Sequence, residues 1–408
     1  MVDYKELMRI LSIPRLNGSS AERETREALI DWLNKNNIPF YLHNFRQYPY
    51  FFVSIGIWII LSRLLLAVSI WLRWGWPSFW IALIGLIGGL VDVALEIPLV
   101  TWIGMKRGKN ILVEIEPEVA NQEIVLSAHY DSKTELLDHH QRLFFIRSLP
   151  FGILISIVLG LLGPIDAGLL QINSSVETLS YIVGILLSLV LLFLSWGLGL
   201  NLSLGPLSPP SQGAVDNGSA CAILLGLADR LTNGDIELEN TKITLALFTG
   251  EEVNMQGSRA YTQARRWMLP TIALNLEIMA QDGDYVFWEK DGSSLRLMPT
   301  YEKVNKEVSD SVKKITGTPA TPTGPVNSDG YSFLRAGIPT TVLGTYDKRL
   351  RDRGFHQPTD NINRVVMERL PEGVDILLDF IQKFDQADKQ ISDFTKSDST
   401  KGKFNDPK

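Results

Sequence analysis

Histidine and acidic side chains stand at the ends of several predicted strands of this chain. His129 and Asp131 follow the apolar run EIVLSA, and the adjacent Glu251 and Glu252 follow TLALF. His356 lies in GFHQPTDN, after the last predicted strand. Imidazole and carboxylate groups that one sheet brings together suit a divalent ion such as zinc. The pattern therefore predicts a metal site.

Two further carboxylates belong to the same set. Asp216 lies in a loop before a predicted helix, and Glu277 lies within LNLEIMA. Adjacent side chains at the end of a strand point in different directions. We therefore expect that Glu251 and Glu252 do not share one task.

Predicted strands and helices alternate along the polar part of the chain, and they must position these residues. A capping box from Ser19 to Glu22 opens the first predicted helix. The predicted strands are 38–45, 109–117, 123–133, 241–252, 270–280 and the second half of 328–344. The longer predicted helices are 19–37, 215–231, 258–267, 294–315 and 365–384. Such alternation is typical of an α/β fold with a mixed, mostly parallel sheet, and ligands bind at the carboxyl ends of its strands.

Composition limits the classes of protein that need to be considered. The chain has 408 residues, of which 45% are hydrophobic and 21% charged, so it can form two or more structural units. The net charge of −6 argues against a nucleic-acid partner. Cys221 is the single cysteine, which excludes an intramolecular disulfide and fits a reducing compartment.

Four windows are long and apolar enough to cross a lipid bilayer as helices, which needs about 20 residues. They are 51–71, 76–103, 146–171 and 179–204. Tryptophans cluster at one hairpin tip, as in an interfacial belt. They are Trp71, Trp74, Trp76 and Trp80. Gly85 and Gly89 form a small-xxx-small pair that would let two membrane helices pack closely.

The predicted spans form two hairpins, so all the polar chain lies on one side of the bilayer. The N-terminus has no apolar signal-peptide core. Basic residues gather near the span ends on the polar side, and they are Arg46, Lys106, Arg107, Lys109, Arg142 and Arg147. The opposite turns carry Arg73, Asp166 and Glu177. The positive-inside rule therefore predicts a multi-pass protein whose polar domain is cytoplasmic.

Three charged residues lie within the predicted spans: Arg63, Asp92 and Glu96. A charge at membrane depth is a functional hypothesis by default, and a transporter or channel is one alternative. Four spans are few for a transporter. We therefore expect Arg63 to pair with Asp92 or Glu96.

The order of the polar motifs resembles the co-catalytic zinc aminopeptidases of clan MH, family M28. That family has A-H-x-D-S, G-A-x-D-N, G-E-E with a following G-S, N-x-D and H-x-x-x-D. This chain reads AHYDS, GAVDN, GEEVNMQGS, NLE and HQPTD. The stretches PRLNGSSAERETREALIDWL and SDGYSFLRAGIP are also similar to the family. The resemblance covers residues 5–385 of the polar chain.

The resemblance implies two zinc ions per chain and a peptide substrate. One zinc would be held by His129 and Glu277, and the other by Glu252 and His356. Asp216 would bridge the two ions.

It also implies roles for the side chains around the ions. Glu251 would be the general base, and Asp131 would orient His129. Asp360 would do the same for His356. A cis peptide is expected between Asp216 and Asn217.

Each residue, considered alone, could have an ordinary structural role instead of a role in a metal site. Asp216 could cap a helix, and Glu251 with Glu252 could begin one. His356 could be a turn residue on the surface. Their joint occurrence in the order of the family favours the metal site.

Three departures from the family matter. Glu277 stands where aminopeptidases usually have Asp, and related carboxypeptidases and deacylases can have Glu there. Asn254 stands where Gly is usual, and asparagine tolerates the left-handed backbone. His129 and Asp216 are separated by the second predicted hairpin, as expected of an insertion at a loop.

The resemblance and the spans together predict the domains. A discontinuous zinc-exopeptidase domain would comprise 1–48, 105–142 and 206–385. Transmembrane hairpins would comprise 49–104 and 143–205, and a disordered polar tail 386–408. The expected activity is that of a membrane-embedded aminopeptidase.

Three other activities on this fold stay open. One is a carboxypeptidase or amide deacylase, and another is a non-catalytic scaffold. The third is a glutaminyl-cyclase-like acyltransferase. Such enzymes use one zinc and typically lose the first histidine ligand, so His129 argues against this alternative.

Overall fold

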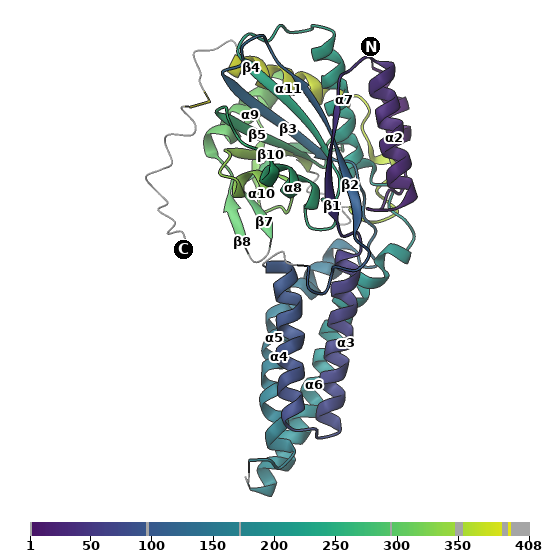
Figure 1. Cartoon of the computed structure of the whole chain (residues 1–408), viewed down its shortest axis with the longest axis vertical. Helices are drawn as coiled ribbons and strands as arrows, with labels where there is room; N and C mark the ends of the chain where they lie inside the picture. The colour runs from purple at the N-terminus through teal and green to yellow at the C-terminus, as the bar shows by residue number, and fades with distance from the viewer. Residues whose placement is uncertain are drawn as a thin grey trace. The chain divides into compact units, whose positions relative to one another are not determined.

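The computed structural model describes residues 2–94, 98–170, 173–293, 296–346, 354–385 and 391–392. It contains two compact units (Figure 1). The α/β unit comprises Met1–Gln47, Lys106–Lys133 and Ser211–Lys408. The helical unit comprises Tyr48–Met105 and Thr134–Pro210. Apart from residues 391–392, the predicted disordered tail 386–408 lies outside the described residues.

An eight-stranded sheet forms the centre of the α/β unit, in the order β1-β2-β4-β3-β5-β10-β6-β9. The strands are β1 Tyr41–Gln47, β2 Lys106–Ile115, β3 Gln122–His129, β4 Thr241–Phe248, β5 Thr271–Glu277, β6 Asp284–Trp288, β9 Thr321–Thr323 and β10 Thr340–Tyr346. The central strands β4, β3, β5 and β10 are parallel, and β1, β2 and β6 pair antiparallel to their inner neighbours. This confirms the predicted mixed, mostly parallel sheet.

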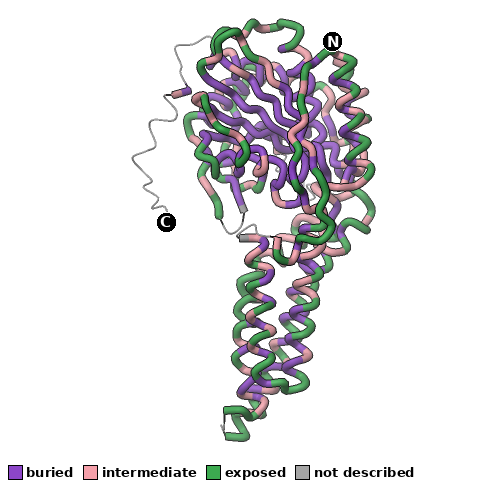
Figure 2. Tube along the Cα trace, in the orientation of Figure 1, coloured by how far each residue is buried: buried purple, intermediate pink, exposed green. Residues whose placement is uncertain are grey.

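Helices pack on both faces of this sheet. They are α1 Tyr4–Leu11, α2 Ser20–Lys35, α7 Ser219–Thr232, α8 Gln256–Ala264, α9 Glu302–Thr316, α10 Gly330–Arg335 and α11 Arg369–Asp385. Side chains alternate along β3, so Ile124 and Leu126 join one apolar cluster and Val125 joins another. The first cluster includes residues of α1, α2, α7, α9 and α11, and the second includes residues of α8 and α10. The central strands are buried along most of their length (Figure 2).

Local sequence accounts for most of these elements. The Ser19 hydroxyl accepts a hydrogen bond from the Glu22 amide and caps α2, as the capping motif predicts. The helix predicted over 294–315 is shorter than expected. Its first part forms β8 (Arg296–Pro299), which pairs with β7 (Lys290–Ser293), and α9 begins only at Glu302.

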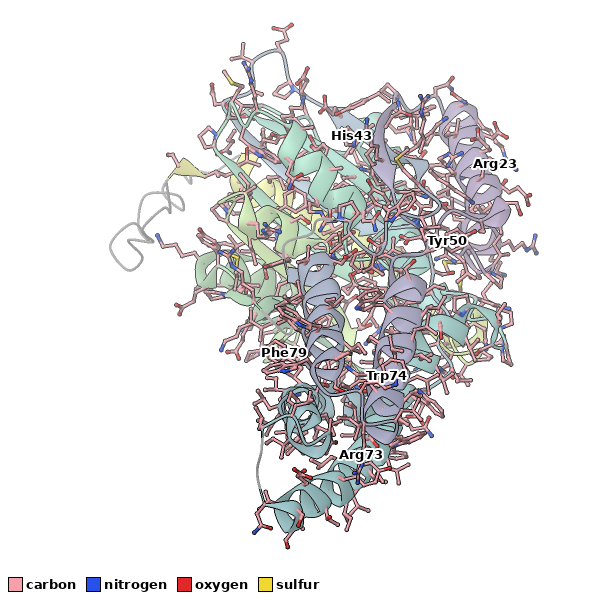
Figure 3. All side chains as sticks on the ribbon, turned by 60° about the horizontal axis from the view of Figure 1, so that its bottom comes forward. Arg23, His43, Tyr50, Arg73, Trp74 and Phe79 are labelled. Carbon is pink, nitrogen blue, oxygen red and sulfur yellow. The ribbon has the colours of Figure 1, made fainter. Side chains whose placement is uncertain are left out.

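The helical unit contains four helices that are long and apolar enough to cross a membrane. They are α3 Phe51–Trp71, α4 Trp76–Ala94, α5 His139–Asp166 and α6 Ser174–Leu204. α3 matches its predicted window, whereas α4 ends well before residue 103. α5 begins earlier than predicted and continues through Pro150 and Pro164. Arg73 and Trp74 lie at the turn between α3 and α4 (Figure 3).

Small residues bring these helices together. A Cβ atom added at Gly85 of α4 would lie 3.0 Å from the Ser62 Cβ of α3. A Cβ added at Gly88 would lie 2.5 Å from the Trp58 ring, whereas one at Gly89 would meet that ring only at 3.8 Å. Gly85 therefore acts as the small-residue pattern predicts, and Gly88 is the more closely packed partner on the next turn.

The predicted pairing of Arg63 with Asp92 is not formed. The Asp92 carboxylate accepts hydrogen bonds from the amides of Leu99, Val100 and Thr101 and from the Thr101 hydroxyl. These bonds close the chain onto the end of α4 and use both carboxylate oxygens. Glu96, the other expected partner, lies outside the described residues.

Candidate metal centre

Three adjacent parallel strands present polar side chains at one edge of the sheet. His129 ends β3, and Glu277 ends β5. Glu251 and Glu252 follow β4 by three and four residues. The register places His129 beside Phe248. Since the carboxyl ends of neighbouring parallel strands meet at one edge, these four side chains converge there.

Asp216 lies between the two histidines. Its Oδ1 is 3.4 Å from His129 Nε2, and its Oδ2 is 3.4 Å from His356 Nε2. Asp216 lies in the segment η2 (Ala214–Gly218) that precedes α7, at a kink where its own backbone angles are not helical. The two oxygens of one carboxylate therefore face two different imidazoles.

Each histidine also has a glutamate beside it. His129 Nε2 is 3.3 Å from Glu277 Oε1, and His356 Nε2 is 3.1 Å from Glu252 Oε2. Ligand atoms of His129, Asp216 and Glu252 all lie within 4.8 Å of one another, as in a group that could hold a metal ion. The structure thus brings together all five residues that the resemblance named as ligands.

Glu251 points into the same space but is not equivalent to Glu252. Its Oε2 lies 3.8 Å from His129 Nε2. Burial raises the pKa of Glu251 well above its usual value, His129 opposes this shift, and the nearby Glu252 and Glu277 add to it. A carboxylate with a raised pKa is suited to accept and return a proton near neutral pH.

Asparagine side chains hold Glu277 in place. Glu277 Oε2 accepts hydrogen bonds from Asn275 Nδ2 at 3.2 Å and from Asn217 Nδ2 at 3.4 Å. Glu277 Oε1 is left facing His129. The extra methylene of glutamate relative to aspartate is therefore accommodated by two amide donors within the described site.

Asp131 contacts both His129 and Glu252. His129 Nδ1 lies 3.1 Å from the Asp131 carbonyl oxygen and 3.5 Å from its Oδ1. A carbonyl oxygen only accepts, so Nδ1 donates there and Nε2 is the nitrogen that can bind a metal. Asp131 Oδ2 accepts a hydrogen bond from the Glu252 amide at 3.3 Å.

Asp360 has a different position from the one expected beside His356. Its carboxylate oxygens accept hydrogen bonds from the Val215 amide at 2.8 Å and from the Asp216 amide at 3.2 Å. Burial, and then Asp216, raise the pKa of Asp360 to about 7. Asp360 therefore supports the backbone that carries Asp216.

The chemistry of these groups fits a bound cation. Glu252 Oε1 and Asp131 Oδ1 are buried without a hydrogen-bond partner. Burial raises the pKa of Glu277 to about 6, and His129 opposes the shift. Several buried carboxylates that repel one another are stabilised when a divalent ion lies among them.

The backbone at the site adopts two conformations that the family resemblance implies. The Asp216–Asn217 peptide bond is cis. Asn254 has φ 79°, the left-handed conformation expected where the family has glycine.

Two buried charged residues near the site were not assigned a role from sequence. Arg15 donates hydrogen bonds to the carbonyl oxygens of Leu11, Ile13, Tyr130, Gln212 and Gly213. It thereby joins α1, the end of β3 and the segment before Asp216.

Asp329 is fully buried with both carboxylate oxygens unpartnered, and burial raises its pKa to about 7. Both lie in the family-like stretches PRLNGSS and SDGYSF, which were the available signal.

Comparison with known proteins agrees with the predicted resemblance. Residues 198–381 match the family model of Peptidase family M28. No curated protein matches the chain in sequence. The fold is similar to that of a zinc aminopeptidase from Bacillus subtilis, with a TM-score of 0.54, 13% identity, and 96% of this chain and 97% of that chain covered.

Two further solved structures have similar folds. A Zn-dependent exopeptidase from Parabacteroides distasonis has a TM-score of 0.53 and 14% identity, with 93% of this chain and 96% of that chain covered. A glutaminyl cyclase from Porphyromonas gingivalis has a TM-score of 0.54 and 13% identity, with coverage of 93% and 96%.

The family match confirms the resemblance to Peptidase family M28, and the structural similarities confirm the zinc-exopeptidase fold. The chain is thus similar to zinc peptidases both in the sequence of residues 198–381 and in its fold. Two of these solved structures are named as zinc enzymes. In this chain the cluster of His129, Asp216 and Glu252 could hold a metal ion.

Proposed function

We propose that the protein is a membrane-embedded exopeptidase that holds two zinc ions and removes N-terminal residues from peptides. The position of Asp216 carries this proposal. Its two oxygens face two histidines, and each histidine has its own glutamate. A shared carboxylate between two histidine–glutamate pairs is an arrangement that suits two neighbouring divalent ions.

In this proposal His129 and Glu277 would hold one ion, Glu252 and His356 would hold the other, and Asp216 would contribute one oxygen to each. When bound, the zinc ions lower the pKa of a water molecule and polarise the substrate carbonyl. Asn275 and Asp131 keep Glu277 and His129 in position through the contacts described above.

Glu251 acts as the general base. Its carboxylate takes a proton from the attacking water and then delivers it to the leaving amine as the carbon–nitrogen bond breaks. Glu252 is held towards His356, so the adjacent Glu251 is free for this task. The two neighbouring glutamates thus divide metal binding and proton transfer.

The four long apolar helices support the proposal that the bilayer is a partner of this chain. We infer that α3 with α4 and α5 with α6 cross it as two hairpins. The basic residues near the helix ends that adjoin the α/β unit in sequence favour a cytoplasmic peptidase domain.

Glutaminyl-cyclase-like acyl transfer is the second candidate, because glutaminyl cyclases share the fold. In that reaction the N-terminal amine of the substrate attacks its own glutamine side chain and ammonia leaves. His129, with Asp216 and Glu277 around it, favours the two-metal peptidase over this alternative.

The test uses the purified full chain in detergent with matched peptides. The panel contains one peptide with a free N-terminus, its N-acetylated form, its C-terminally amidated form and an N-terminal glutaminyl analogue. We expect cleavage of the free and the amidated peptide but not of the acetylated one. Activity should be lost with a chelator and restored by zinc.

Cleavage of the acetylated peptide from its C-terminus would contradict the aminopeptidase assignment and favour a carboxypeptidase. Release of ammonia from the glutaminyl peptide without peptide-bond cleavage would favour the cyclase. No turnover of any peptide by zinc-loaded protein would contradict the enzymatic proposal.

A further inference from the structure

Arg63 is a buried cation within the helical unit. It lies in α3, and 8% of its surface is exposed. Its Nη1 atom is fully buried and has no hydrogen-bond partner. A guanidinium has five N–H donors and keeps its charge in proteins, so an unpaired one inside an apolar helix bundle is costly.

No acidic side chain of the described helices neutralises this charge. The Asp92 carboxylate already accepts hydrogen bonds from the amides of residues 99–101. Asp166 lies at the far end of α5 from the residues that surround Arg63. In the part of the chain that the structure describes, Arg63 therefore forms no ion pair, and an anion that pairs with it must come from outside that part.

Arg63 lines a cavity between α3, α5 and α6. The cavity volume is about 50 Å³. Its lining residues are Ile59, Arg63, Phe145, Ser148, Leu149, Gly152, Ile153, Leu194, Ser195 and Leu198. A Cβ atom added at Gly152 would meet only a Leu191 methyl group, at 3.9 Å, so Gly152 leaves the cavity open.

The lining defines what the cavity can bind. One cation and two hydroxyl groups lie on an otherwise apolar wall. A ligand that matches this wall has one anionic group and a hydrocarbon body. Leu149 and Ile153 are 40% and 46% exposed, so the cavity wall continues to the outer surface of the bundle. Such a ligand can enter from the hydrocarbon of a bilayer.

We propose that this cavity binds a long-chain fatty acid, with its carboxylate on Arg63 and its chain along α5 and α6. The depth of Arg63 in the proposed bilayer favours a fatty acid over a phospholipid. Arg63 lies 12 residues after Phe51 in α3 (63 − 51 = 12), or about 18 Å along a helix that crosses a core of about 30 Å. A compact carboxylate can reach this depth while its chain stays in hydrocarbon, whereas a phospholipid head group would be drawn far from the surface.

The test measures binding of radiolabelled oleate to the full chain in phosphatidylcholine nanodiscs. Arg63→Met removes the charge and keeps the length of the side chain, and Arg63→Lys keeps the charge. Gly152→Leu fills the cavity without touching the charge. Arg73→Met, at the turn beyond α3, is the matched control for loss of an arginine.

We expect Arg63→Met and Gly152→Leu to weaken oleate binding about tenfold or more, since a hydrogen-bonded charge pair is lost or displaced. Arg63→Lys should bind within a few-fold of the wild type, and Arg73→Met should be unchanged. Oleyl alcohol, which has the same chain without the charge, should not compete. Thermal unfolding of each variant shows whether the bundle remains folded.

Equal binding of oleate by Arg63→Met and the wild type would overturn the proposal. Competition by oleyl alcohol as strong as that by unlabelled oleate would also overturn it. Displacement of oleate by phosphatidylglycerol but not by other fatty acids would show a phospholipid site instead. The assay needs no peptide turnover, so its result is independent of the proposed peptidase activity.

Discussion

At the scale of single residues, the resemblance of the motifs was enough to name five side chains that lie together and to place Asp131 beside His129, but not to place Asp360. His129, Asp216 and Glu252 converge because the motifs follow strands that are neighbours in the sheet. Asp360 was expected beside His356, and it instead accepts the Val215 and Asp216 amides. Such a contact depends on where a loop returns, which local sequence does not specify.

Arg15 yields a prediction about stability. Replacing it with methionine removes donors from five backbone carbonyl oxygens. Because each buried group left unsatisfied costs about 1–3 kcal/mol, we expect a loss of at least about 3 kcal/mol in the free energy of unfolding. Urea denaturation of the full chain in detergent measures this loss.

Arg23 offers the matched control, because it is exposed on α2 (Figure 3). Arg23→Met should change the free energy of unfolding by less than about 0.5 kcal/mol. Equal stability of Arg15→Met and Arg23→Met would show that the carbonyl contacts of Arg15 contribute little.

At the scale of elements, periodicity predicted the buried strands and long helices well and their boundaries less well. β4 and β5 were predicted because their residues are apolar and rich in β-branched types. β8 was predicted as part of a helix because its pairing with β7 is a tertiary contact. The window 76–103 is apolar throughout, yet Pro98 lacks the amide that a continuing helix needs.

Close packing of α3 on α6 yields a second prediction. A Cβ atom added at Gly56 would lie 2.6 Å from the Gly199 carbonyl oxygen, which is backbone and cannot turn away. Gly56→Ala should therefore separate the two helices and destabilise the helical unit by about 1–3 kcal/mol.

Gly152→Ala is the control, since its added Cβ has 3.9 Å to its nearest neighbour. Thermal unfolding in detergent should show a lower midpoint for Gly56→Ala only. The same midpoint for both variants would argue against the close contact of α3 and α6.

At the scale of the whole molecule, the order of the four predicted spans along the chain implies one membrane topology. Both hairpins leave and re-enter the α/β unit in sequence, so the proposed topology puts its three segments on one side of the bilayer. The distribution of basic residues predicts that this side is cytoplasmic. The division into an α/β unit and a helical unit follows from the hydropathy pattern, because apolar windows and polar motifs do not overlap.

Cysteine labelling tests this topology, since the native Cys221 is buried. Leu170→Cys lies in the turn after α5, and Val119→Cys lies between β2 and β3, both at exposed positions. A membrane-impermeant maleimide added to intact cells should label Leu170→Cys and should reach Val119→Cys only after lysis. The reverse pattern would place the α/β unit outside the cytoplasm.

The most direct measurement compares Glu251→Gln with Glu252→Gln, the same change at adjacent residues. Zinc per chain and peptide turnover are measured on both purified variants. We predict that Glu251→Gln retains its zinc and loses about 10²–10⁴-fold in turnover, as expected when a general base is removed. Glu252→Gln should lose zinc as well as activity, because its carboxylate faces His356. Wild-type turnover by Glu251→Gln would contradict the division of tasks between the two glutamates.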